Sequence, residues 1–234
     1  IVFVIIVPIL TMRVIAEERK QKTDQLLYSL PITTFQVIMG KYLALLIVYL
    51  IPLAIISIYP LIFAQFGDVY LLTSYGSILA FFVMGAALLA VGMFISSLTD
   101  NQGFAAGIGI AVILLNYFSV SLAEYVSATA MGSAIVLCIF AALLGCIVHH
   151  LTKNDTLSYG LVIVLILGVC ITYRIDSSVF EGLIPDIMTK LSLFKRFSTF
   201  VNGVFDMSAI VYYLTVIVFF LFLSVQSLEK RRYN

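Results

Sequence analysis

Long apolar runs separated by short polar segments make up most of this chain. Apolar windows of helical length predict seven membrane crossings, the first of them partial. We place them at Ile1–Met12, Phe35–Phe63, Tyr75–Leu98, Gly103–Leu122, Met131–Leu151, Leu157–Tyr173 and Met207–Leu228. Strands of a membrane barrel would be about ten residues long and would alternate apolar with polar residues. The runs therefore predict an all-α fold, a polytopic transmembrane helix bundle.

Local sequence signals refine the second predicted crossing. Thr33 and Gln36 have the spacing of a capping box, which predicts a helix start just before the second crossing. Pro52 and Pro60 within that crossing predict a kink or an early break.

Apolar residues at helical spacing in 175–206 predict an amphipathic segment outside the cytoplasm. That segment is either a helix lying in or dipping into the interface, or a plain linker.

The composition supports a place in the lipid bilayer and excludes several classes of protein. Hydrophobic residues make up 62% of the chain and charged residues 11%, against about 45–50% and about 25% in soluble domains. A soluble fold of this length could not hide so much apolar surface from water. The net charge of +1 leaves no basic surface with which to bind nucleic acid.

The ends of the chain and its basic residues predict how it is placed in the membrane. The first run is too short for a crossing, which needs about 20 residues, and it begins with Ile. We therefore expect a missing N-terminal span upstream. Nine of the 13 basic residues fall on one side, and the positive-inside rule makes that side the cytoplasm. They lie in 13–22, at Lys41 and Lys153, and in 230–232.

The polar stretch 13–31 joins the first two crossings on the predicted cytoplasmic side. Glu18 and Lys22 stand four residues apart in the order that supports a helix, and Leu26, Leu27 and Leu30 form a narrow apolar stripe. This pattern predicts one or two short amphipathic helices along the membrane surface, with a charged face that could meet a soluble partner. A solvated loop is the alternative.

The same stretch and its neighbours carry a resemblance to a known family. The residues concerned are Pro8, Leu10–Arg13, Ala16–Lys20, Thr23, Leu26, Leu27, Leu30, Pro31, Gly40 and Lys41. Their pattern resembles the signature of type-2 ABC transporter permeases, most closely the branch that includes gliding-motility permeases. The tail from Phe200 to Arg232 is similar to the closing span of that branch.

The resemblance implies a function for 13–31 as a coupling helix held in a groove of an ATP-hydrolysing subunit. The implied coupling residues are Arg13, Glu17, Glu18, Arg19, Thr23, Leu26 and Leu27. Two features depart from the family pattern. Lys22 stands where many members have Gly, and the spans within Met131–Tyr173 are additional to the usual six helices, so eight crossings are expected in the whole protein.

The resemblance also implies the setting in which the chain works. It implies a single permease domain over 1–234 in the bacterial cell membrane, acting as a dimer with a second permease copy or homologue. ABC ATPase subunits would be its partners. This chain would bind no cofactor, because ATP and Mg would be bound by those partners, and export is the implied direction of transport. The transported substrate does not follow from the pattern.

The residues themselves separate this function from two other classes. The chain has no GxxxxGK[ST] loop, so we expect a transport subunit rather than an enzyme. An ion-coupled secondary transporter, the alternative function, normally needs ionisable groups at membrane depth. The predicted span centres offer only Asn116, which we interpret as a helix–helix hydrogen bond. An intramembrane enzyme is disfavoured because the adjacent His149 and His150 cannot chelate one metal as an i, i+4 pair would.

Small residues predict one further packing feature. Gly103 and Gly107 form a GxxxG face at the start of the fourth crossing, a spacing that lets membrane helices approach closely. We interpret this face as static helix packing rather than as a moving part.

Overall fold

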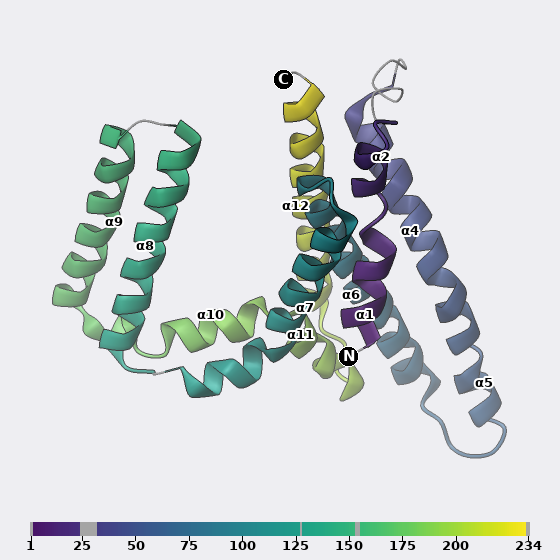
Figure 1. The fold of residues 1–234 in the computed structure, drawn as a ribbon. Helices are drawn as coiled ribbons and strands as arrows, with labels where there is room; N and C mark the ends of the chain where they lie inside the picture. Colours follow the sequence, from purple (N-terminus) through teal and green to yellow (C-terminus); the bar gives the residue numbers. More distant parts are fainter. Residues whose placement is uncertain (1, 24–31, 127, 153–154, 233–234) are drawn as a thin grey trace. The chain divides into compact units, whose positions relative to one another are not determined.

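The computed structural model describes residues 2–23, 32–126, 128–152 and 155–232, without the side chains of 147–158 and 231–232. Throughout these ranges the regular structure is helical, with no strand, so the predicted all-α fold class is confirmed. The α-helices, labelled in Figure 1, are α1 (Val2–Thr11), α2 (Ala16–Lys20), α4 (Thr34–Ile56), α5 (Tyr59–Phe63), α6 (Leu71–Leu98), α7 (Gln102–Tyr125), α8 (Ala130–Thr152), α9 (Asp155–Ile175), α10 (Leu183–Leu191), α11 (Leu193–Val201) and α12 (Met207–Arg232). A 3-10 helix, η1 (Ser177–Phe180), lies between α9 and α10 in the chain.

A helix lies at each of the seven predicted crossings, although fewer of these helices qualify as complete spans. Four described segments are long and apolar enough to cross a membrane, namely Thr34–Phe63, Leu71–Leu98, Gln102–Tyr125 and Met207–Lys230. The pair Tyr159–Ile175 and Ser177–Leu191, bent by 119°, would be a fifth if it counts as one span. The chain is therefore a multi-pass membrane protein with four or five candidate spans in the described residues, consistent with the predicted transmembrane helix bundle.

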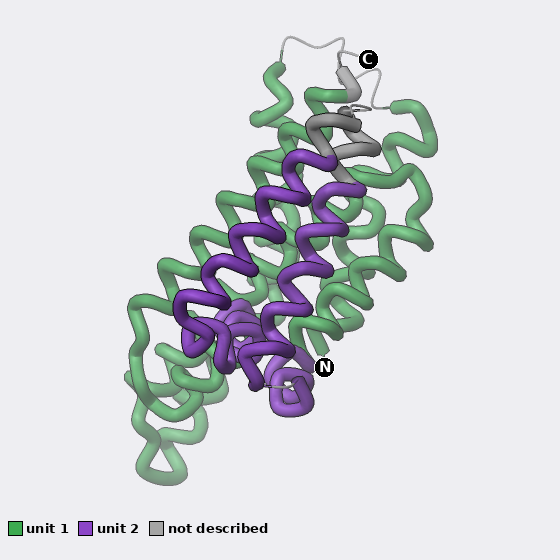
Figure 2. The backbone as a smooth tube through the Cα atoms, turned by 90° about the vertical axis from the view of Figure 1, so that its left-hand side faces the viewer, with its two compact units in different colours: residues 1–117, 193–234 green, residues 118–192 purple. Residues whose placement is uncertain are grey.

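The chain divides into two compact units, coloured separately in Figure 2. Unit 1 comprises residues 1–117 and 193–234, and unit 2 comprises residues 118–192. The predicted amphipathic segment 175–206 is helical, with η1 and α10 in unit 2 and α11 in unit 1. The single permease domain over 1–234 stays a prediction.

Helix α6 is the centre of unit 1, because α1, α4, α11 and α12 all pack on it. Its buried face is rich in small residues, which bring neighbouring backbones close. Two tyrosines of α4 reach across to carbonyl groups of α6. The Tyr42 hydroxyl donates to the Ala86 carbonyl at 3.0 Å, and the Tyr49 hydroxyl donates to the Phe81 carbonyl at 2.8 Å.

Two glycines of α6 mark the positions where its neighbours approach most closely. A Cβ atom added at Gly85 would lie 2.3 Å from the Tyr49 hydroxyl oxygen, and one at Gly92 would lie 2.4 Å from Thr11 Oγ1. At Gly107 the same atom would meet nothing within 4 Å, and at Gly103 only Asn101 Oδ1 at 3.4 Å. The close contacts of the described chain therefore lie at Gly85 and Gly92, and the packing role of Gly103 and Gly107 stays a prediction.

The local signals in the second crossing are confirmed. Thr33 caps α4, with its hydroxyl accepting from the Gln36 N–H and the Gln36 side chain accepting from the Thr33 N–H. The helix contains Pro52 and ends at Ile56, and α5 then starts with Pro60 in its first turn. Proline accounts for this break because it has no N–H with which to continue the helical hydrogen-bond ladder.

Helix α11 lies along the first half of α6. The ring of Phe197 is 5.7 Å from that of Phe81, which stands about 15 Å along α6 at 1.5 Å per residue. The first residue of α11, Leu193, is held on both sides of its backbone. Its N–H donates to Asn116 Oδ1 at 3.1 Å, and its carbonyl accepts from the Tyr213 hydroxyl at 2.8 Å. The interpretation of Asn116 as an interhelical hydrogen-bonding residue is confirmed.

Unit 2 is a helical hairpin of α8 and α9, followed by η1 and α10. Phe180 of η1 is buried, with its ring 5.9 Å from that of Tyr173. The Gly182 N–H donates to the Ala128 carbonyl at 2.9 Å and so ties the chain ahead of α10 to the start of the hairpin. Gly182 has a φ of 70°, a conformation that glycine adopts without a steric cost. The side chains of His149 and His150 lie outside the described residues.

We expect Gly85→Ala and Gly92→Ala to destabilise the protein by about 1–3 kcal/mol each, because the added methyl group overpacks a buried contact. Gly107→Ala is the matched control, since its methyl group enters open space and alanine favours a helix. Thermal unfolding of the detergent-purified variants measures the effect. Equal melting midpoints for all three variants would show that α6 does not pack as described.

Candidate functional site

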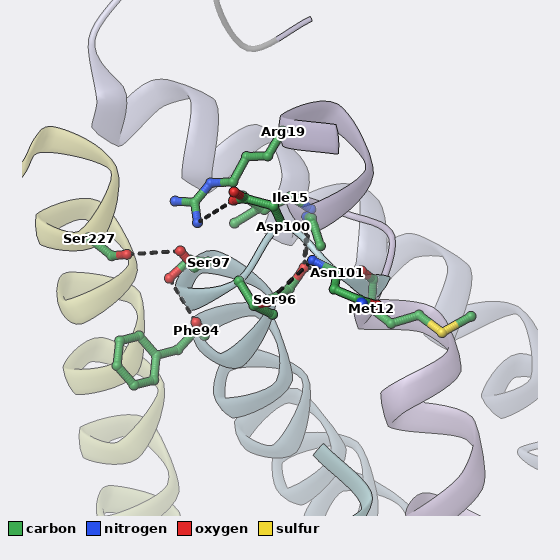
Figure 3. A network of polar contacts seen from close by, with 11 residues as sticks. Met12, Ile15, Arg19, Phe94, Ser96, Ser97, Asp100, Asn101 and Ser227 are labelled. Atoms are coloured by element: carbon green, nitrogen blue, oxygen red, sulfur yellow. Dashed lines mark hydrogen bonds and ion pairs between the residues drawn. The ribbon is translucent and has the colours of Figure 1, made fainter. Parts of the chain in front are cut away.

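The start of α2 is held by one hydroxyl group of another helix. Ser96, near the end of α6, is fully buried. Its Oγ accepts from the N–H groups of Ile15 at 3.3 Å and Ala16 at 3.1 Å, and it donates to the Met12 carbonyl at 3.3 Å (Figure 3). The first N–H groups of a helix have no partner within that helix, and the N-cap residue Ile15 provides no side-chain oxygen. Ser96 therefore caps α2 from α6.

Arg19 points inward from α2 toward the end of α6. Its side chain is only 2% exposed, and Nη1 lies 3.9 Å from Oδ1 of Asp100, two residues past the end of α6 (Figure 3). A buried guanidinium is costly without compensation from an opposite charge. The pair with Asp100 supplies such compensation, so this ion pair is a second link between α2 and α6.

Lys41 links the same short helix to α4. Its ammonium group donates to the Val14 carbonyl at 2.8 Å and also contacts Glu18 Oε2 in an ion pair. The Lys41 side chain is half-buried, and that of Glu18 is partly exposed. Because Lys41 stands in the second turn of α4, its long side chain reaches back to the helix end in the manner of a snorkelling lysine.

A further pair of serines joins α6 to α12 at the same end of unit 1. The Ser227 hydroxyl donates to the Ser97 carbonyl at 3.0 Å, and the Ser97 hydroxyl donates to the Phe94 carbonyl at 2.7 Å (Figure 3). The last carbonyl groups of a helix lack intrahelical partners, so Ser227 satisfies one of those of α6. We call these links, together with those of Ser96, Arg19 and Lys41, the polar junction.

The predicted coupling residues that the structure describes differ in exposure and in hydrogen bonding. Arg13 is exposed, Glu17 is half-buried and accepts from Gln21 Nε2 at 3.2 Å, and the Thr23 hydroxyl donates to the Glu18 carbonyl at 3.2 Å. Glu18 and Arg19 are engaged inside the polar junction. Leu26 and Leu27 lie outside the described residues. The role of all seven in ATPase coupling stays a prediction.

Sequence reasoning missed Ser96 and Asp100 as members of this site. Ser96 stands next to Ser97 in an otherwise apolar helix, and Asp100 stands in the turn after it. These positions gave a weak signal, namely polar groups where the chain leaves the bilayer. Their partners lie about 80 positions away in the chain, and only the packing of α1 on α6 brings them together.

The polar junction consists of hydrogen bonds and ion pairs between helix ends. In the described part of the chain, no group of three or more His, Cys, Asp or Glu side chains could hold a metal ion. What the arrangement does physically is to connect one short surface helix to the ends of α4 and α6 at once.

These features define a class: a multi-pass α-helical membrane protein with a short surface helix fixed to its bundle. A family model described as ABC-2 family transporter protein matches residues 1–140. The match covers more than half of the chain, which therefore belongs to the ABC-2 transporter family and is an ABC permease subunit. The resemblance to type-2 permeases is confirmed, while the gliding-motility branch stays a prediction. Comparison with curated proteins and with solved structures finds no match.

We expect Ser96→Ala to destabilise the permease by about 1–3 kcal/mol, because it leaves two buried N–H groups without an acceptor. Ser97→Ala is the matched control. It removes a neighbouring buried hydroxyl that bonds only within α6, to a carbonyl already in the helical ladder, so its effect should be smaller. Thermal unfolding measures both. A Ser97→Ala variant as unstable as Ser96→Ala would contradict the capping role of Ser96.

Proposed function

We propose that this chain is the membrane subunit of an ABC exporter in the bacterial cell membrane, driven by separate ATPase subunits that dock on the end of unit 1 that carries α2. The working assembly would contain a second permease copy or homologue. ATP and Mg would be bound by the ATPase subunits alone. Export is the direction that the type-2 resemblance implies, and the membership of the family supports the use of ATPase partners.

The observation that carries this proposal is the simultaneous attachment of α2 to two membrane helices. Ser96 and Asp100 tie it to the end of α6, and Lys41 ties it to α4. A helix of five residues has too few internal hydrogen bonds to persist alone, so its position depends on these links. A partner that displaces α2 would therefore displace the ends of α4 and α6 with it.

The mechanism follows from this attachment. ATP-driven closure of the ATPase pair would move α2, and the bonds of the polar junction would pass that movement to α4 and α6. Arg19 would act as a positioning residue, since its side chain is buried toward Asp100. Glu18 would transmit force to α4 through Lys41. The path for the substrate would open between the two permease halves.

The polar groups at depth in the spans fit a transporter that is powered from outside the membrane. Asn116 is the polar residue that the sequence places near a span centre, and its side-chain oxygen accepts a hydrogen bond from the Leu193 N–H. An ion-coupled transporter would need ionisable groups in such a place. The energy source is thus better sought in a soluble partner that contacts α2.

Co-purification tests the proposal directly. We expect an ATP-binding chain to accompany the affinity-tagged permease from bacterial membranes, and its ATP turnover to depend on the permease. A permease that purifies from native membranes with no such chain, or an ATPase whose turnover is the same without the permease, would overturn the proposal.

We expect Lys41→Gln to leave ATPase binding within about two-fold of wild type and to reduce the permease-dependent stimulation of ATP turnover several-fold. The substitution removes the ion pair between α4 and Glu18 but changes nothing on the exposed side of α2. Glu18→Gln should have the same effect, and the double variant should be no worse than either single one, because both lose one shared link. Additive losses in the double variant would count against this transmission route.

A further inference from the structure

Some charged side chains of residues 13–23 pair with other parts of the bundle, and others are exposed. Glu18 is paired with Lys41, and Arg19 with Asp100, so these two residues of α2 are engaged within the bundle end. The side chains left exposed include three cations: Arg13, Lys20 and Lys22. We call these three residues the cationic face.

One carboxylate of the described segment lies outside both ion pairs. Glu17 is half-buried and accepts from the Gln21 side chain. Asp24, the next charge along the chain, lies outside the described residues. Even when both carboxylates are counted against the three cations, the exposed charge of the segment is positive. An opposing surface that fits it would carry carboxylates.

Lys22 of this face has an unusual backbone conformation. Its φ is 57°, and it is the one non-glycine residue with positive φ among those that the structure describes. The Thr23 N–H donates to the Glu18 carbonyl at 3.0 Å, and the Lys22 N–H donates to the Arg19 carbonyl at 3.1 Å. This pair of bonds is a Schellman motif, in which Lys22 occupies the left-handed position that glycine usually fills.

A lysine at that position is unfavourable for the fold alone. A side chain in the left-handed region has a steric cost that glycine avoids. The Schellman motif ends α2 through backbone hydrogen bonds, which do not depend on the side chain at position 22. The end of the helix therefore does not require a cation at that position. Residues held in such conformations cluster at sites where another requirement outweighs the strain. Among the described residues the Lys22 side chain is exposed, and we take the requirement to be a contact with a partner.

We infer that the cationic face of Arg13, Lys20 and Lys22 contacts a carboxylate-lined groove of the ATPase subunit, and that Lys22 is retained for this contact at the expense of backbone strain. This inference rests on the proposed function. It also moves the predicted docking contact from Glu17, Glu18 and Arg19 to the exposed cations, because Glu18 and Arg19 are engaged with Lys41 and Asp100 on the inner side.

Anionic lipid headgroups are the other surface that cations at a membrane boundary could meet. Attraction to such headgroups is diffuse and depends on the number of nearby cations rather than on their fixed positions. It would give no reason to keep a lysine at a strained position just after a five-residue helix that is tied to two neighbours. The fixed geometry favours a protein groove.

Binding of the co-purifying ATPase to the permease in nanodiscs of zwitterionic phosphatidylcholine tests the inference. Lys22→Gly removes the charge and relieves the strain, whereas Lys22→Arg keeps both. We expect Lys22→Gly to raise the melting midpoint of the permease by about 2 °C and to weaken ATPase binding about three-fold or more, as the loss of an exposed ion pair does. Lys22→Arg should bind within about two-fold of wild type.

The matched control is Lys230→Gln, which removes an exposed lysine from the end of α12, outside the coupling segment. It should leave both the binding and the melting midpoint unchanged. Removing all three cations together should weaken binding at least ten-fold, and the remaining affinity should depend less on salt concentration.

Three results would overturn the inference. The first is that the Lys22→Gly variant and the triple variant bind the ATPase as tightly as the wild-type permease does. The proposed function survives that result, because the wild-type permease still binds the ATPase. Another is a loss with Lys22→Gly that appears only in nanodiscs containing phosphatidylglycerol, which would indicate a lipid contact. The last is an equal loss with Lys230→Gln, which would indicate a nonspecific charge effect. Absence of any ATPase binding to wild-type permease would overturn the proposed function together with the inference.

Discussion

The unpaired backbone groups at the start of α2 are the constraint on which the rest of the site depends. A five-residue helix has almost no internal hydrogen bonding, so the N–H groups of Ile15 and Ala16 need an acceptor from elsewhere. The Ser96 hydroxyl of α6 is that acceptor, and it also donates to the Met12 carbonyl. One buried side chain therefore joins the turn after α1, the start of α2 and the end of α6 into a single piece.

Helix α6 can serve as this anchor because its buried face is rich in small residues. Gly85 and Gly92 leave no room for a methyl group beside Tyr49 and Thr11, so α4 and α1 lie directly against the α6 backbone. Tyr49 then bonds to the Phe81 carbonyl. Close packing of this kind transmits displacement with little loss, which is the physical property that a coupling device at the end of these helices would require.

The charged side chains of residues 13–23 occupy two environments that the sequence alone does not distinguish. Glu18 and Arg19 are adjacent in the chain, yet each is drawn to a different helix end, by Lys41 and by Asp100. Because these two charges are opposite, their engagement leaves the net charge of the segment positive, and its exposed cations, Arg13, Lys20 and Lys22, form the cationic face. Strain at Lys22 then marks one position of that face, because a folded chain accepts a left-handed lysine only when the surroundings impose it.

Local sequence signals by themselves determined the all-α fold, the helix positions, the capping box at Thr33 and the break near Pro60, because these features depend on residues close together in the chain. The motif around α2 was also sufficient to indicate the transporter family. Only the tertiary structure decided which polar groups meet: Ser96 with Ala16, Arg19 with Asp100, and Asn116 with the start of α11. It also placed close helix contacts at Gly85 and Gly92 of α6. Such pairings join positions up to about 80 residues apart. They follow from how whole helices pack, which no local pattern of residues encodes.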